Sequence, residues 1–210
     1  MSKLRLVLIV VGLSVFLVGV MVFGLSKLGG SVGKTVDVEQ LVNGARWVTE
    51  KGKVKVTVVE FSDLQCPACK QAEKIAKQVR DMDGVRFVYR QFPLTNIHKN
   101  AMISAVAIEV AREKGKGWEL LEKLFDRQDE WAEKTNKEMR VYLGEMGMEL
   151  GLDGSELVRF LDDPKYKDGV MTDLSLAEKL VLPGTPTFFV DGEKVNTDQL
   201  IEVVKTNLGK

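Results

Sequence analysis

Two cysteines, Cys66 and Cys69, are the only thiols in this chain of 210 residues, and Pro67 and Ala68 lie between them. A pair of thiols at this spacing can form a structural disulfide, hold a metal ion or act as a reversible dithiol–disulfide couple. A disulfide that closes so short a loop constrains the unfolded chain very little, because its entropic effect grows with loop length. We therefore expect a redox couple rather than a structural disulfide.

The sequence around the cysteines predicts how they are positioned. VKVTVVEF (54–61) is apolar and β-branched, which is typical of a buried strand, and residues with the spacing of one helix face follow it: Ala72, Ile75, Ala76 and Val79. Pro67 suits the first turn of that helix, where its missing N–H group is no loss. Cys66 would lie at the helix N-terminus, where free N–H groups and the helix dipole lower the pKa of a thiol. Cys66 is the expected nucleophile, and the more buried Cys69 is the expected resolving thiol.

The rest of the chain predicts an α/β fold. VRFVYRQF (85–92) predicts a second strand, so that strand, helix and strand form a βαβ unit with a right-handed crossover. Helix-forming sequence dominates residues 96–180. TFFVDGEKV (187–195) predicts a hairpin, and DQLIEVVKTNLG (198–209) predicts a closing amphipathic helix. The expected order is βαβ, a helical insert and ββα.

Three segments in this order resemble the DsbA-type thiol–disulfide oxidoreductases, in particular their membrane-anchored bacterial form: EFSDLQCPAC (60–69), FPL (92–94) with the following His98, and VLPGTPTFFV (181–190). The resemblance extends over about residues 36–208. It implies a thioredoxin fold with a helical domain inserted between its halves at about residues 96–180. It also implies that the redox-active Cys66–Cys69 disulfide takes the place of a bound cofactor.

The resemblance assigns roles to residues near the cysteines. Thr185 and Pro186 match the cis-proline pair of the family, which packs against the active disulfide and leaves the preceding backbone free to pair with a substrate strand. An ordinary trans-proline turn is the alternative. Pro67 and Ala68 are further expected substrate contacts. Ala68 stands where oxidase-type members often carry a histidine that stabilises the thiolate, so the oxidising strength stays open.

Glu60 lies at the end of the predicted buried strand, six residues before Cys66. A buried carboxylate is costly unless it is paired, hydrated or protonated. In thioredoxin-like proteins an acid at this spacing relays the proton of the resolving cysteine, and the resemblance implies this catalytic role for Glu60. The alternatives are a surface glutamate or a salt-bridged one, with Arg86 or Arg90 of the neighbouring strand as its partner.

His98 is the only histidine in the chain. A zinc site of Cys66, Cys69 and His98, with Asp63 or water as the fourth ligand, would have few ligands to draw on, and no resident metal is expected. We expect His98 to be a packed or capping residue at the start of a helix over residues 96–114. The large apolar residues that follow are expected in the core of the insert: Trp118, Trp131, Met139, Met146 and Met148.

The N-terminal segment differs in composition from the rest of the chain. Residues 6–25 carry no charge and are long enough to cross a bilayer as a helix, and the preceding Lys3 and Arg5 indicate a cytoplasmic N-terminus. A cleaved signal peptide is the alternative, although its apolar region is usually shorter. The expected organisation is a cytoplasmic N-terminus (1–5), a transmembrane anchor (6–25), a flexible linker (26–35) and a thioredoxin-like domain (36–210).

The 30 basic residues balance the 30 acidic ones, so nothing in the charge favours a nucleic acid as partner. We expect a monomeric, membrane-anchored enzyme whose catalytic domain lies outside the cytoplasm and introduces disulfides into unfolded or reduced exported proteins. The resemblance implies re-oxidation by a quinone-linked membrane partner. The same dithiol could serve a disulfide reductase or isomerase. A non-enzymatic, client-binding chaperone and a metal-binding protein are further alternatives.

Overall fold

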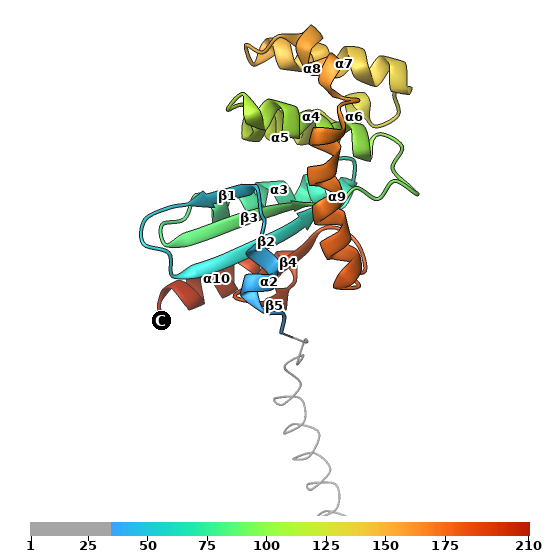
Figure 1. Cartoon of the computed structure of the whole chain (residues 1–210). Coiled ribbons are helices and arrows are strands. Elements are labelled where there is room, and N and C mark those ends of the chain that lie inside the picture. The colour runs from blue at the N-terminus through green and yellow to red at the C-terminus, as the bar shows by residue number, and fades with distance from the viewer. Residues whose placement is uncertain (1–34) are drawn as a thin grey trace, which may run out of the picture. The chain divides into compact units, whose positions relative to one another are not determined.

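Five strands form a mixed β-sheet at the centre of the fold (Figure 1). The computed structural model describes residues 35–210, and its strands follow the spatial order β1-β3-β2-β4-β5. Their bounds are β1 (Trp47–Glu50), β2 (Val56–Ser62), β3 (Val85–Gln91), β4 (Thr187–Val190) and β5 (Glu193–Val195). Strands β2 and β3 run parallel, whereas the other neighbouring pairs are antiparallel. This is the α/β sheet of the predicted βαβ and ββα halves.

Helices connect and cover these strands. They are α2 (Val38–Val42), α3 (Pro67–Arg80), α4 (Ala101–Glu113), α5 (Gly117–Asp126), α6 (Gln128–Trp131), α7 (Asn136–Glu149), α8 (Gly154–Phe160), α9 (Pro164–Lys179) and α10 (Leu200–Leu208), with a 3-10 turn at Thr197–Gln199. Helices α4 to α9 all lie between β3 and β4 in the chain, as a helical insert. Figure 1 shows α7 and α8 farthest from the sheet, and α9 running from that end back toward it.

Every residue of β2 is buried, because helices cover both faces of the sheet. Side chains alternate between the faces of a strand, so Val58 and Val59 point in opposite directions. Val58 packs with α3 and α10, and Val59 packs with α2 and the C-terminal part of α9. Because Glu60 is two residues from Val58, its side chain lies in the layer between the sheet and α3.

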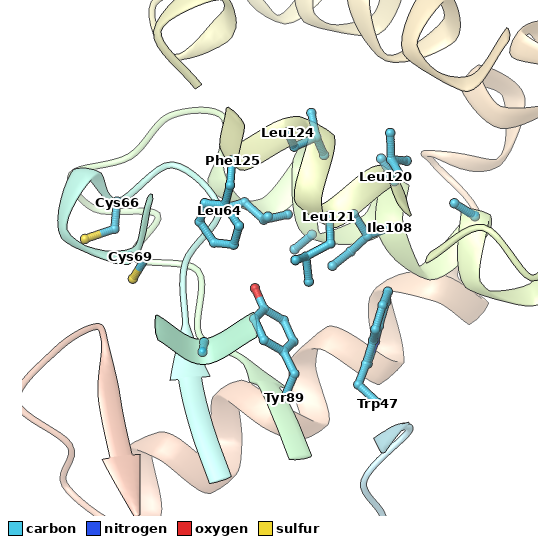
Figure 2. Packing of buried hydrophobic residues seen from close by; sticks show 14 of the residues in the cluster. Trp47, Leu64, Cys66, Cys69, Tyr89, Ile108, Leu120, Leu121, Leu124 and Phe125 are labelled. Carbon is cyan, nitrogen blue, oxygen red and sulfur yellow. The ribbon is translucent and has the colours of Figure 1, made fainter. Parts of the chain in front are cut away.

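Trp131, Met139 and Met146 are buried as predicted, in an apolar cluster that continues from the insert to the α3 face of the sheet (Figure 2). Trp118 instead joins the insert to the sheet, since its ring lies 5.1 Å from that of Trp47 in an edge-on contact. The prediction for Met148 is wrong, because 60% of this residue is exposed. Its side chain lines a surface pocket between α7 and the start of α8.

The structure differs from the sequence-based prediction in two places: two elements were not predicted, and one helix begins later than expected. The prediction lacked α2 and β1, and β1 is a short edge strand that pairs only with β3 among the described strands. The helix expected from residue 96 begins at Ala101. Residues 95–97, 99 and 100 form turns, and the Asn100 side chain does not cap the helix but donates to the carbonyl oxygens of Trp131, Ala132 and Lys134.

A buried ion network ties the insert to the sheet. Arg90 of β3 donates to the Asp173 carboxylate of α9 at 2.7 Å, and it also donates to the carbonyl oxygens of Leu41 and Asn43. Asp173 in turn accepts the backbone N–H of Gln91 at 3.1 Å. With these partners, each of the three nitrogens of the buried Arg90 guanidinium donates at least one hydrogen bond. The network fixes the angle at which α9 returns to the sheet.

None of the helices formed by residues 35–210 is both long and apolar enough to span a membrane. The predicted anchor at 6–25, and most of the predicted linker at 26–35, lie outside the described residues. The described part of the chain from Val36 onward forms one unit.

Candidate active site

The first turn of α3 positions both cysteines. Cys66 is the N-cap residue, with extended backbone angles, and Pro67 occupies the first helical turn as predicted. The Cys66 N–H donates to the Asp63 carbonyl at 3.0 Å, which closes the turn between β2 and the helix. Pro67 and Ala68 are exposed at this end of α3. The helix begins here because Pro67 has no N–H to lose and a suitable φ.

The two thiols differ in environment. Cys66 is 8% exposed, whereas Cys69 is 0% exposed, and both are free thiols in this structure. A hydrogen bond from the Cys69 side chain lowers the pKa of Cys66 to about 5, despite burial, with further help from the Cys69 and Ala68 backbone N–H groups and the Thr185 side chain. Burial raises the pKa of Cys69 well above its usual value, and the neighbouring Cys66 adds to this. At neutral pH the pair therefore holds one thiolate, on Cys66, and one proton, on Cys69.

The loop before β4 lies against Cys66. The Thr185–Pro186 peptide bond is cis, which is the geometry expected from the resemblance. The Cys66 Sγ lies 3.5 Å from the Thr185 carbonyl oxygen. Thr187 Oγ1 donates to the Gly184 carbonyl at 2.7 Å and holds the loop in shape. The structure thus brings the predicted Thr185–Pro186 loop, late in the chain, next to the predicted nucleophile Cys66.

Glu60 lies below the cysteines and is fully buried. Burial raises the pKa of its carboxyl to about 8, and the charge of Glu73 on α3 adds to this, while Ser62 and Arg80 oppose it. Glu60 is therefore largely protonated at neutral pH. Protonation is one of the three ways, with pairing and hydration, in which a buried carboxyl group avoids the cost of an uncompensated charge.

The salt-bridged alternative for Glu60, with Arg86 or Arg90 as its partner, does not hold in the structure. In the parallel register Glu60 lies beside Tyr89, so Arg86 and Arg90 point to the opposite face of the sheet. Arg86 pairs with Glu50 at 2.6 Å, and Arg90 pairs with Asp173.

Asp63 and His98 hold the loops on either side of the site. The His98 Nδ1 lies 2.7 Å from Asp63 Oδ2, which also accepts the Leu94 N–H at 2.8 Å. His98 is therefore a packed residue, one of the two expected roles, and the N-cap residue of α4 is Asn100. Among residues 35–210, no three His, Cys, Asp or Glu side chains come together as a possible metal site.

Two side chains that sequence reasoning missed tie the cysteine loop to the insert. Gln128 of α6 donates its side-chain amide to the carbonyl oxygens of Leu64 at 2.7 Å and Cys66 at 3.0 Å. Gln65 donates to the Ala132 carbonyl at 2.7 Å and accepts the Asn100 N–H at 2.6 Å. Both side chains are buried. The only sequence signal for these hydrogen bonds was the presence of polar residues inside the predicted helical insert. That signal does not identify the groups to which the side chains bond.

Comparison with known proteins identifies this arrangement. Residues 47–209 match the sequence profile of the family described as Thioredoxin. The chain belongs to the thioredoxin family. Its Cys66–Cys69 pair and cis-proline loop lie within the matched range.

Solved structures with the same fold share most of its length. Oxidised BdbD from Bacillus subtilis is 25% identical, with a TM-score of 0.69, and the match covers 85% of this chain and 98% of that one. A thioredoxin-like oxidoreductase from Silicibacter pomeroyi is 28% identical, with a TM-score of 0.66 and coverage of 83% and 99%. Alpha-DsbA1 from Wolbachia pipientis is 18% identical and shares the fold, with a TM-score of 0.67 and coverage of 83% and 96%. These matches confirm the predicted resemblance to DsbA-type thioredoxin-fold proteins.

One curated sequence relative is a much longer protein. The chain is 35% identical over 150 residues to the Na(+)/H(+) antiporter NhaA 3 of Salinispora tropica. The match covers 71% of this chain but only 22% of the antiporter. Ion transport is therefore not carried over to this thioredoxin-family chain.

Proposed function

We propose that this chain is a thiol–disulfide oxidoreductase that introduces disulfides into reduced exported proteins through Cys66 and Cys69. The observation that supports it most is the unequal pair of thiols beside the cis-proline loop. One sulfur reaches the surface and carries a thiolate near neutral pH, and the other is buried and keeps its proton. A thiolate is both the better nucleophile and the better leaving group in disulfide exchange, so Cys66 is the sulfur that bonds to the client.

The reaction begins with the Cys66–Cys69 disulfide. A client thiolate attacks the Cys66 sulfur, the disulfide breaks, and its electron pair leaves on the Cys69 sulfur, which takes up a proton. The second client thiolate then attacks the client sulfur of the mixed disulfide and releases Cys66 as a thiolate. The client has lost two electrons and two protons; one proton stays on Cys69 and the other goes to solvent.

The direction of exchange follows from the stability of the reduced form. A low pKa at Cys66 stabilises the dithiol and makes the disulfide more oxidising. Disulfide reduction or isomerisation is the second candidate, favoured by Ala68, which has no side-chain donor for the Cys66 thiolate. Equilibration with glutathione decides between the two, because reduction potentials range from about −270 mV for thioredoxin to about −120 mV for DsbA.

The proposed location is outside the cytoplasm, with the uncharged segment 6–25 as an uncleaved membrane anchor. A thiol couple that works as an oxidant suits such a compartment, since cytoplasmic reductants would keep it reduced. Re-oxidation of the dithiol then falls to a membrane partner, for which a quinone-linked protein is the proposed class. Reduced or unfolded exported proteins are the proposed clients.

Two cysteine variants test the proposed reaction. Cys69→Ala should accumulate mixed disulfides through Cys66 when it is mixed as the glutathione-activated form with a reduced, unfolded protein. Cys66→Ser should form none. Free thiols in the client and protein adducts on non-reducing gels are the measurements. If both variants oxidise the client as fast as the unmodified protein, the mechanism is wrong.

A further inference from the structure

One face of α7 exposes two large apolar side chains. Val141 is 57% exposed and Met148 is 60% exposed. They are seven residues apart on the helix, which is close to two full turns, so they share a face. Figure 1 shows α7 in the part of the insert that lies away from the sheet. Exposed apolar side chains that lie together on one face commonly mark a contact surface between proteins.

Hollows in the surface flank Val141 on both sides along α7. One hollow, of about 470 Å³, lies toward the helix N-terminus and is lined in part by Lys134, Glu138 and Tyr142. The other, of about 670 Å³, lies toward the helix C-terminus, and Met148 lines it. Val141 borders both hollows. This face therefore combines projecting side chains with recesses that could receive them.

Two charged residues of opposite sign lie at equal distances along the helix from Val141. Lys137 is four residues before it and Glu145 is four residues after it, and both are exposed. This spacing keeps all three residues on one face of α7. Within residues 35–210 neither Lys137 nor Glu145 forms a salt bridge, whereas Arg140 of the same helix pairs with Asp162. The two charges are therefore available to a partner.

Two other charged residues near this face have partners on the same chain. The Lys134 ammonium lies 5.3 Å from the centre of the Tyr142 ring. The Glu138 carboxylate accepts hydrogen bonds from the backbone and side chain of Thr135 in the capping box at the start of α7. These contacts occupy both residues. The unpaired lysine and glutamate on either side of the exposed valine are thus distinct from their charged neighbours.

A face with this arrangement of charges is complementary to itself. When two copies of a helix pack antiparallel about a two-fold axis at Val141, a residue before Val141 faces the residue at the same distance after it in the other copy. Lys137 of each copy then faces the partner's Glu145, so the opposite-charge pair forms twice. Met148 of each copy faces the partner's Lys134 and the hollow beside it. Methionine is flexible enough to fit such a recess.

We propose that two copies of this chain associate through α7, as an antiparallel helix pair with Val141 on the two-fold axis. The occupant of this face is a second copy, because a two-fold axis pairs the unpartnered Lys137 and Glu145 with each other at both ends of the contact. The inference goes beyond the proposed function, since it involves neither cysteine, and it replaces the monomer expected from the sequence. One helix from each copy buries less surface than a permanent dimer does, so the association should depend on protein concentration.

Charge reversal in the full chain tests this contact. The protein is purified in detergent, and its dissociation constant is measured by sedimentation at concentrations from about 1 µM to about 100 µM. Lys137→Glu and Glu145→Lys each turn two opposite-charge pairs into two like-charge pairs, so each should weaken the association by at least about tenfold. Glu202→Lys and Lys205→Glu change exposed residues of α10 and are the matched controls, which should keep the dissociation constant of the unmodified protein.

Two further combinations should restore the association. The double variant Lys137→Glu/Glu145→Lys exchanges the two charges and sets opposite charges face to face again. An equimolar mixture of the two single variants, one of them isotope-labelled, should form mixed pairs in preference to like pairs, because only a mixed pair has opposite charges at both ends. Native mass spectrometry distinguishes the two kinds of pair. Recovery in the mixture also shows that both single variants are folded.

Three results would overturn the proposal. A monomer at every concentration would mean that α7 serves a different kind of partner or none. Association that neither reversal weakens would mean that the copies meet through another surface. Weakening in the single variants without recovery in the double variant or the mixture would exclude the antiparallel pairing about Val141. The proposed function is tested separately by the two cysteine variants, so either idea can fail while the other stands.

Discussion

Gln128 of the helical insert donates its side-chain amide to the carbonyl oxygen of Cys66 across 3.0 Å. The same amide donates to Leu64, so one buried residue of α6 holds both sides of the turn before the nucleophile. The backbone angle of Cys66 thus depends on the insert as well as on the thioredoxin-type half. The insert acts as a support for the nucleophile in addition to any client contacts it makes.

Removal of this support should weaken the site. Gln128→Leu leaves two buried carbonyl groups with one partner fewer, and we expect a loss of about 1–3 kcal/mol in unfolding free energy. Disulfide exchange at Cys66 should also slow. Urea unfolding of the oxidised protein and the rate of alkylation of the reduced one are the measurements. Gln78→Leu, the same change on the exposed face of α3, is the matched control, and equal effects of the two changes would contradict this role.

The Thr185 side chain is one of the groups that hold the pKa of Cys66 at about 5. Thr185→Val keeps the shape but loses the hydroxyl, so the pKa of Cys66 should rise and the couple should become more reducing. The pH dependence of alkylation by iodoacetamide measures the pKa, and equilibration with glutathione measures the potential. Thr172→Val, an exposed threonine of α9, should change neither. An alkylation profile in Thr185→Val that matches the unmodified protein would remove Thr185 from the set of stabilising groups.

Glu60 makes folding depend on pH in a predictable direction. Burial raises its folded-state pKa to about 8 from a usual value of 4.5. Between these values the folded state holds the proton and the unfolded state does not, so this contribution is fully present below pH 4.5 and is lost as the pH rises to 8. Glu60→Gln removes the dependence and should be more stable than the unmodified protein by about 3 kcal/mol at pH 7.

Chemical unfolding of the oxidised forms at several pH values tests this expectation. The stability difference between Glu60→Gln and the unmodified protein should grow from near zero at low pH. A difference that is constant with pH would show that Glu60 ionises normally and is hydrated in solution.

The buried pair of Arg90 and Asp173 should be far more sensitive to substitution than the exposed pair on the same strand. Asp173→Ala leaves a buried guanidinium without its carboxylate, which typically costs about 3–5 kcal/mol. Glu50→Ala breaks the exposed pair with Arg86 and should cost less than about 1 kcal/mol. Thermal unfolding of both variants is the comparison. Similar losses would mean that solvent reaches Arg90 and compensates its charge.

The sequence predicted most of the catalytic strand and helix, because their signals are local. The β-branched run of β2, Pro67 after Cys66 and the helical spacing in α3 depend on neighbours a few residues away. The partners of Glu60 depend on which face of β3 each residue occupies, and on the register with β2, which composition does not specify. The contact of Gln128 with Cys66 joins positions 62 residues apart. Such pairs follow from the way the insert packs, so they become visible only in the folded structure.

The contact between Cys66 and the Thr185 carbonyl spans 119 residues of chain, with the whole helical insert in between. A polypeptide made from its N-terminus onward therefore presents both sulfur atoms long before the loop that completes their surroundings has been synthesised. Until β4 joins the sheet beside β2, the nucleophile lacks the Thr185 groups that face it. The order of segments along the gene product thus delays the reactive form of the site until the loop at Thr185 and strand β4 have emerged from the ribosome.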